Sequence, residues 1–509
     1  MKLQLAMIFG EHMVLQRDQE IKVWGKSCEN DTITVELNEQ TEKAETVKGN
    51  WMVTLKPEEA NEKTFLRVTS KKTGESIQFN DVAIGEVWLA GGQSNMEFLM
   101  KYDYDFTDTC KLENDDLLRY FCYPHVPFHG YLDYNDIPDE GYWRKWTDEK
   151  ERSYFSAIAT YMSMTLRKKL NVPVGIINCN WGGSPALAWA DPKKIEDDET
   201  FKTVVDWQKR NLDNTDWPRY INGSETPLPE KSAAELEFEN RFMMGEDMTE
   251  FFKNFDPSKM PQPDYALFAL GPRSVVRPGG LYETMLKPIA PYGIKGALWY
   301  QGEDDDAREW VDFYDKSVKA MIESWHELWG YEFPFIIIEL APFMGVGVTG
   351  AKRYDDMRKK QDRVAEDVKN VHPVCILDAG EQYNIHPRHK KVVGKRVGNI
   401  VMKHVYGDES LTADCPRAVS AERKGNEITV RFINSAEGLR VKGDLREELK
   451  VQVNGQNVDF EYEVSKDKLK ISAELNGDKA VIRYCISNWC IARLFNSEDN
   501  PAFGFEYEV

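Results

Sequence analysis

Five short apolar runs, separated by stretches with helical spacing, restrict the folds open to this chain of 509 residues. The runs lie at residues 86–90, 174–179, 296–300, 335–341 and 374–379. Runs of this length, rich in Val, Ile and Leu, are typical of strands that are buried on both faces. Apolar residues recur at helical spacing in three further segments, 155–170, 314–328 and 393–404. Alternating strands and helices predict an α/β fold with a parallel sheet wrapped by helices.

Short alternating strands at both ends of the chain frame this α/β region. Residues 1–80 and 411–509 carry closely spaced runs such as "DTITVEL" and "EITVRFI", which predict small antiparallel β modules. They could be two separate modules or two halves of one sandwich. The α/β core is placed at residues 81–410, with residues 191–280, rich in Trp, Phe, acidic residues and Pro, expected to be an insertion.

The formal net charge of −20 argues against nucleic acid or an anionic membrane as the main partner. No window approaches the roughly 18 consecutive apolar residues of a membrane span. The start, "MKLQLAMIFGEHMVLQR", lacks the apolar core of a signal peptide, so a cytoplasmic location is expected unless such a peptide has been removed. Eight scattered cysteines do not form a disulfide framework, and reduced thiols are expected.

Polar residues follow four of the five predicted strands, where each strand ends. The sequences at these exits are "GGQSN", "NWGGS", "QGEDD" and "GEQYNIHP". Open α/β sheets bind ligands at the carboxyl ends of their strands. A hydroxyl, glycine amides, a side-chain amide with acids, and a histidine are therefore expected to converge on one site.

Within this site, Ser94 is the candidate nucleophile and His386 the candidate base. Ser94 follows a strand in a tight turn, where a hydroxyl is exposed for attack, although most serines in turns have no such role. The turn is not the G-x-S-x-G elbow of α/β-hydrolases, because Met96 stands at the second glycine position. His386 lies between a strand and a helix; it could take the Ser94 proton, or simply cap that helix.

A tetrahedral intermediate also needs hydrogen-bond donors, which Gly183 and Gln301 could supply. Gly183 in "NWGGSP" can present its backbone N–H without an obstructing side chain. Gln301 in "WYQGEDDD" can offer its side-chain amide. The alternatives are an ordinary tight turn for the glycines and an exposed loop amide for Gln301.

Several blocks of the sequence resemble the sialate O-acetylesterase family, a branch of the SGNH hydrolases. The blocks are "GEVWLAGGQSNM", "NWGGSPALAWA", "LYETMLKPIAPYGIKGALWYQGE" and "IHPRHKKVVGKRV", and the two ends of the chain are also similar. The resemblance implies a three-layer SGNH-type core and removal of acetyl groups from O-acetyl sugars, without a metal or cofactor. It makes Ser94 the nucleophile and His386 the base, and it places the N–H groups of Ser94 and Gly183 with the Gln301 amide in the oxyanion hole.

The acid that would orient the histidine is the main departure from related esterases. Those enzymes often carry an aspartate two or three residues before the histidine, where this chain has Asn384 and Tyr383. Glu303, Asp378 or Glu381 could take its place, or a backbone carbonyl could orient the ring in a Ser-His dyad, which we favour. Glu303 could equally brace the glycine turns beneath the site.

The sequence leaves the sugar open. Trp181 and Tyr300 are candidate aromatic contacts, and Arg358 is a candidate cation for an acidic sugar such as sialic acid. Acetylated hemicellulose (xylan, mannan or xyloglucan) is an alternative substrate, and a non-catalytic glycan-binding protein is an alternative function. The G-x-G-x-x-G match at residues 345–350 is expected to be a flexible loop, and no metal or nucleotide motif is present, so no cofactor is predicted. The oligomeric state is not predicted.

Overall fold

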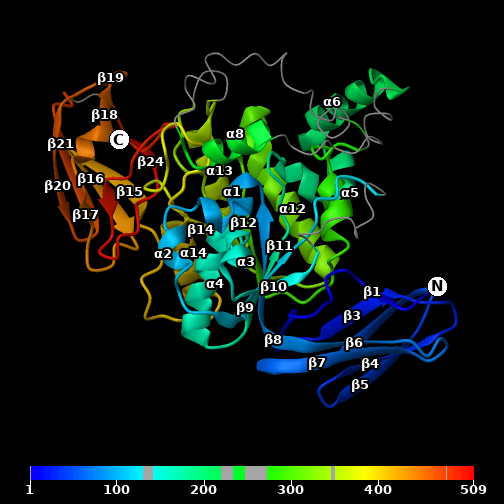
Figure 1. Cartoon of the computed structure of the whole chain (residues 1–509). Coiled ribbons are helices and arrows are strands. Elements are labelled where there is room, and N and C mark those ends of the chain that lie inside the picture. Colours follow the sequence, from blue (N-terminus) through cyan, green and yellow to red (C-terminus); the bar gives the residue numbers. More distant parts are fainter. Residues whose placement is uncertain are drawn as a thin grey trace.

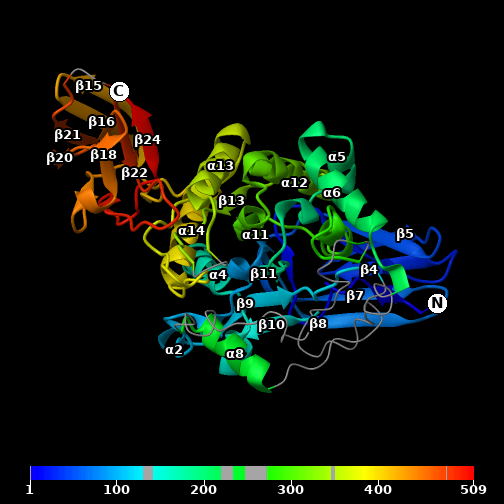
Figure 2. The ribbon, with the colours of Figure 1, turned by 90° about the horizontal axis from the view of Figure 1, so that it is seen from above.

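A computed structural model describes residues 2–129, 141–218, 233–246, 271, 273–345, 350–476 and 479–509. An α/β body lies between the N-terminal strands and the C-terminal strands, which occupy opposite ends of the molecule (Figures 1 and 2). The predicted mixed α/β fold with antiparallel sheets at the C-terminus is therefore confirmed. Within these ranges no helix is both long and apolar enough to span a membrane.

The central sheet has the strand order β10-β9-β11-β8-β12-β13-β14. Its strands are β8 (Ser76–Gly92), β9 (Asp115–Cys122), β10 (Trp143–Trp146), β11 (Val174–Asn178), β12 (Gly296–Tyr300), β13 (Phe335–Ile338) and β14 (Val371–Val374). Every neighbouring pair is parallel except β10 with β9. Four of the five predicted strands lie in this sheet as expected, whereas β9 and β10 were not predicted.

The fifth predicted strand, at residues 374–379, is wrong. The strand that forms the sheet edge is β14, which ends at Val374. Its Pro373 lacks a backbone N–H and is tolerated at an edge. Beyond it the chain leaves the sheet, and the apolar side chains of Cys375 and Leu377 pack into the core of the C-terminal sheets instead.

Strand β8 joins the N-terminal strands to the central sheet. Its first part pairs antiparallel with β7 (Asn61–Ser70), and its last residues pair with β11 and β12. The remaining N-terminal strands are β1 (Gln4–Leu5), β2 (Val14–Gln16), β3 (Ile21–Lys26), β4 (Thr32–Leu37), β5 (Gln40–Glu45) and β6 (Asn50–Leu55). One hydrophobic core extends through these strands and the α/β body. The predicted boundary between residues 80 and 81 falls inside β8 and stays a prediction.

The C-terminal strands enclose a second hydrophobic core, so the two terminal β regions are not halves of one sandwich. The strands are β15 (Arg417–Lys424), β16 (Glu427–Ile433), β17 (Arg440–Val441), β18 (Leu449–Val453), β19 (Gln456–Asn457), β20 (Phe460–Ser465), β21 (Lys468–Ala473), β22 (Ala480–Tyr484), β23 (Leu494–Phe495) and β24 (Phe505–Glu508). They form two four-stranded antiparallel sheets and one two-stranded sheet.

The three predicted helices are present. The helices of the described residues are α1 (Ser94–Glu97), α2 (Phe106–Thr109), α3 (Glu149–Ser153), α4 (Ala157–Leu170), α5 (Pro192–Glu196), α6 (Lys202–Asp213), α8 (Ala233–Met243), α11 (Glu303–Ala307), α12 (Tyr314–Trp329), α13 (Tyr354–Asp367) and α14 (Lys390–His404). Helix α12 ends at Gly330, whose φ of 81° matches a glycine cap. Helix α14 packs closely on α4, because a Cβ at Gly394 would lie 2.7 Å from the Ile158 carbonyl oxygen. This close contact holds α14 against α4, and α14 begins shortly after His386.

The predicted insertion at residues 191–280 lies partly outside the described residues. Its described part contains α5, α6 and α8 and contributes no strand to the central sheet. The loop predicted at residues 345–350 likewise falls mostly outside the described residues.

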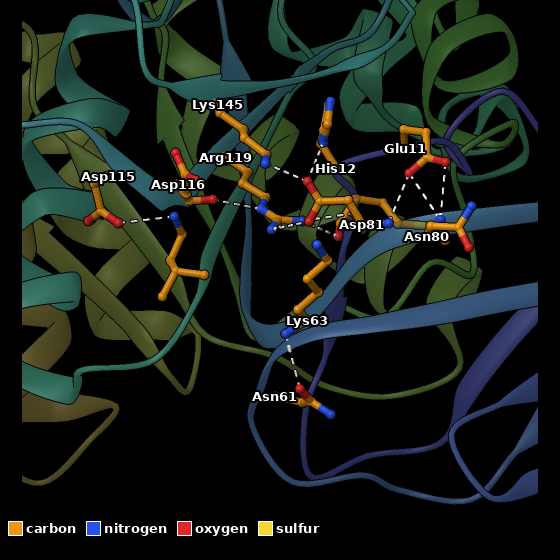
Figure 3. A network of polar contacts seen from close by, with 12 residues as sticks. Glu11, His12, Asn61, Lys63, Asn80, Asp81, Asp115, Asp116, Arg119 and Lys145 are labelled. Carbon is orange, nitrogen blue, oxygen red and sulfur yellow. Dashed lines mark hydrogen bonds and ion pairs between the residues drawn. The ribbon is translucent and has the colours of Figure 1, made fainter.

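Asp81 on β8 ties the N-terminal strands to the edge of the central sheet (Figure 3). Its carboxylate lies 2.8 Å from Nη2 of Arg119 on β9 and 2.7 Å from Nδ1 of His12, and it also pairs with Lys145 on β10. The Arg119 side chain is only 2% exposed, so Asp81 is its main counter-charge. One carboxylate therefore holds three segments that are far apart in the sequence.

Candidate active site

Ser94 lies at the carboxyl end of β8, in the middle of the central sheet. Gly92 has a φ of 134°, and a Cβ there would lie 2.2 Å from the Tyr300 carbonyl oxygen. Only glycine fits this close approach. The Gln93 N–H donates to the same carbonyl at 3.1 Å, and Ser94 then begins α1. The short turn leaves the Ser94 side chain partly exposed at the strand end.

The structure brings the two candidate catalytic side chains together. Nε2 of His386 lies 2.8 Å from Oγ of Ser94. His386 belongs to the loop between β14 and α14 and is 8% exposed. Its backbone N–H donates to Oδ1 of Asn384, whose Nδ2 donates to Glu381. The loop therefore presents the imidazole in a fixed position.

The imidazole of His386 is poised as a proton acceptor. Burial, together with the positive charge of Lys390, lowers the pKa of His386 to about 3. The ring is therefore neutral at ordinary pH, as a general base for the Ser94 hydroxyl requires. Its Nδ1 is buried and has no hydrogen-bond partner among the described residues.

None of the three candidate acids contacts the imidazole in the described part of the chain. Glu303 accepts a hydrogen bond of 2.6 Å from Nδ2 of Asn95, Asp378 pairs with Arg396 at 3.0 Å, and Glu381 accepts from Asn384 and from the Arg388 N–H. Glu303 is 6% exposed, and burial raises the pKa of its carboxyl. An orienting role for Glu303 stays a prediction, whereas its bond to Asn95 braces the Ser94 turn.

Two backbone N–H groups near Ser94 remain available as donors. As the first residue of α1, Ser94 has no partner for its N–H inside that helix. Gly183 is exposed, has a φ of 70°, and its N–H makes no recorded bond to a described residue. The neighbouring Gly182 N–H is already used, because it donates to Glu97 at 2.9 Å.

Gln301 is fully buried, so the alternative of an exposed loop amide is wrong. Its Nε2 lies within hydrogen-bond distance of Gln93 Oε1 at 3.2 Å, the Ser184 carbonyl at 3.1 Å and Asp305 Oδ2 at 2.6 Å. Burial raises the pKa of Asp305 to about 7. In this conformation the Gln301 amide holds the residue next to Ser94 in place, and a direct contact with an oxyanion stays a prediction.

Of the predicted sugar contacts, Trp181 alone keeps part of its side chain exposed. Its ring stacks on His125, with centroids 4.3 Å apart, and its backbone N–H donates to Gly92. Tyr300 is fully buried, and Arg358 is 5% exposed and donates to the Ser487 carbonyl. A sugar contact by either of these two stays a prediction that their burial does not favour.

Residues missed by the sequence analysis also lie at the site. Phe242 on α8 contacts His386 edge to face, with ring centroids 5.6 Å apart. The same helix is held near the site by a 3.0 Å bond from the Tyr102 hydroxyl to Asn240. These contacts join distant parts of the chain, and no local sequence pattern signals them.

Residues 269–402 match a sequence profile described as a carbohydrate esterase, sialic acid-specific acetylesterase. The chain is 23% identical to the sialate O-acetylesterase of Rattus norvegicus over 448 residues, which cover 81% of this chain and 75% of that protein. It is 25% identical to the sialate O-acetylesterase of Homo sapiens over 451 residues, 81% of this chain and 73% of that protein. The crystal structure of a carbohydrate acetylesterase from Xanthomonas citri has the same fold, with a TM-score of 0.75, 24% identity and 99% coverage of both chains.

Proposed function

We propose that this chain, which belongs to the sialate O-acetylesterase family, is a serine esterase that removes O-acetyl groups from sugars. The observation that carries the proposal is the 2.8 Å contact between Ser94 Oγ and His386 Nε2 at the carboxyl end of β8. The named relatives act in the same class of chemistry, and their similarity extends over most of the chain. A non-catalytic glycan-binding protein would not need a hydroxyl paired with a neutral, buried imidazole.

The proposed reaction passes through an acetyl-enzyme. His386 Nε2 takes the Ser94 proton while Oγ attacks the acetyl carbonyl, and the N–H groups of Ser94 and Gly183 stabilise the oxyanion. The intermediate collapses, the ester C–O bond breaks, and His386 returns the proton to the leaving sugar hydroxyl. His386 then deprotonates a water that attacks the acetyl carbonyl on Ser94. When this second intermediate collapses, the bond between the acetyl carbon and Oγ breaks, His386 returns the proton to Oγ, and acetate leaves.

We propose that His386 works in a dyad with Ser94. Two observations on the described residues support this arrangement: Nδ1 of His386 has no hydrogen-bond partner among them, and the three candidate acids bond to groups other than the imidazole. Gln301 then contributes by holding Gln93 beside the nucleophile. To bond the oxyanion directly, its amide would have to give up one of its present acceptors.

The proposed catalytic core is a three-layer SGNH-type domain at residues 81–410, with β modules at residues 1–80 and 411–509. The parallel order of the central strands supports it, as does the packing of α4 on α14 and of α12 on α13. These two helix pairs are proposed to cover opposite faces of the sheet.

The names of the relatives make O-acetylated sialic acids the first substrates to test, with acetyl-xylan and acetyl-mannan fragments beside them. The assay is acetate release by the wild type, by Ser94→Ala, and by Ser410→Ala as an exposed control serine. Ser94→Ala should lose several orders of magnitude in kcat, and Ser410→Ala none. A wild type inactive on all acetylated sugars, or an active Ser94→Ala, would overturn the proposal.

A further inference from the structure

Lys390 is a buried cation close to the candidate nucleophile. It begins α14, is 1% exposed, and its Nζ donates to Oδ1 of Asn95 at 2.5 Å. The ammonium also lies over the rings of Phe98 and Tyr300, 4.8 and 5.4 Å from their centroids. A lysine is rarely buried to this extent unless its charge is compensated.

Asn95, the residue after Ser94, connects this cation to both sides of the site. Its Nδ2 donates to Glu303 Oε1 at 2.6 Å and to the carbonyl of Ile385 at 2.9 Å. Ile385 is the residue before His386. Protonated Lys390 can only donate, so in this form it selects the amide orientation that leaves Nδ2 facing the two acceptors. A rotated amide would turn its oxygen toward a carboxylate and a carbonyl, and both bonds would be lost.

Lys390 is also the positive charge that balances Glu303 inside the protein. Burial raises the pKa of Glu303, and the charge of Lys390 acts against this rise. Burial lowers the pKa of Lys390 to about 7, while Glu303, Glu381 and Asp103 act to raise it. The same charge, facing His386 from the start of α14, lowers the pKa of the imidazole.

We infer that Lys390 is a positioning residue of the esterase, which fixes the Asn95 amide and so ties the Ser94 turn to Glu303 and to the His386 loop. Its positive charge also favours the ionised form of Glu303 and, together with burial, the neutral form of His386. The inference rests on the proposed function, because it assigns Lys390 a part in the same reaction without contact to the substrate.

The test compares Lys390→Met with Lys391→Met. The side chain of Lys391 points to a different partner, Asp105, at 3.1 Å, which makes it a matched control on the same helix. Lys390→Met should lower kcat by about ten- to a hundredfold, with KM nearly unchanged, because the nucleophile and base lose their alignment. The acidic limb of its pH–rate profile should also move up by about one pH unit, since a nearby positive charge has been removed. Lys391→Met should match the wild type in both.

Three further variants separate the effect of the Lys390 charge from that of its hydrogen bond. Lys390→Gln keeps a donor for Asn95 but lacks the charge, so it should recover part of kcat and retain the shifted limb. Because Lys390 acts through Asn95, adding Lys390→Met to Asn95→Ala should cost little beyond the larger single loss. The inference is overturned if folded Lys390→Met keeps the wild-type kcat and an unshifted limb. Where neither lysine variant folds, it is overturned if folded Asn95→Ala keeps the wild-type kcat.

A measurement without turnover distinguishes the two proposals. Ring ¹⁵N NMR of His386, assigned against His386→Ala, should show an imidazole in the wild type that is neutral at ordinary pH and titrates with a midpoint of about 3. In Lys390→Met or Lys390→Gln the midpoint should be higher. An inactive wild type would refute the esterase alone, whereas an unchanged His386 midpoint would refute the inference about Lys390 alone.

Discussion

Replacing Asp81 with Asn should destabilise the joint between the N-terminal strands and the central sheet. The change removes the counter-charge of Arg119, whose side chain is 2% exposed, while Lys145 and His12 lose the same partner. Removing one member of a buried ion pair costs about 3–5 kcal/mol. Arg119 keeps three backbone carbonyl acceptors, from Met13, Asp116 and Asp81 itself, so the lower end, about 3 kcal/mol, applies.

This loss converts into a modest shift of the melting temperature. The hydrophobic core that contains this joint extends from Leu3 to Ala413, which makes a large cooperative unit. The unfolding entropy is about 2.1 cal/mol/K per residue, so a unit of about 410 residues has an unfolding entropy of about 0.9 kcal/mol/K. A loss of about 3 kcal/mol then lowers Tm by about 3 to 4 °C, which calorimetry measures directly.

The control and the pH dependence make this prediction specific. Asp116→Asn changes an exposed carboxylate on β9, the strand that carries Arg119, and should leave Tm nearly unchanged. Although burial opposes it, the hydrogen bond from Lys145 and the charge of Arg119 hold the pKa of Asp81 well below its usual range. The difference in Tm between wild type and Asp81→Asn should therefore reach its full size above about pH 5 and shrink as pH falls below about 4. Equal Tm values for Asp81→Asn and wild type at pH 7 would refute the reasoning.

Three further predictions concern the candidate site. Because the pKa of His386 is about 3, kcat/KM should stay level as pH falls to about 4; a limb near pH 6.5 would contradict this. Gln301→Ala should lower kcat about ten- to a thousandfold while product binding changes little, whereas a loss confined to KM would indicate a substrate contact. Glu303→Gln should reduce kcat more than Asp378→Asn, since Glu303 binds Asn95 beside the nucleophile; the reverse order in steady-state assays would argue against this network.

The central strands could be predicted because both of their faces are buried, which leaves continuous apolar runs such as those of β11 and β12. Strand β9 escaped prediction because it carries Arg119, a charge whose burial depends on the Asp81 carboxylate of another strand and on backbone carbonyls. Residues 375–379 misled the prediction because Cys375 and Leu377 face the core of the C-terminal sheets, whereas Ile376 and Ala379 pack into the first core. An apolar run indicates burial, and it does not indicate which core buries it.

The candidate site, too, could be predicted only where local sequence carries the signal. Ser94 and His386 could be found because each lies where a strand exits toward the ligand-binding edge of the sheet. Phe242 and Lys390 could not, because their contacts depend on how distant segments pack. From the sequence, a lysine at the start of a helix is expected to be exposed to solvent. The structure shows instead that Lys390 is buried and bonded to Asn95.

The most direct test of the central claim is to locate the nucleophile by covalent labelling. The wild type is inactivated with diethyl p-nitrophenyl phosphate, and the labelled peptide is identified by mass spectrometry. The account predicts one diethylphosphoryl group on Ser94, incorporated in parallel with the loss of esterase activity, and none at this site in Ser94→Ala. Complete inactivation with the label on another residue would contradict the account.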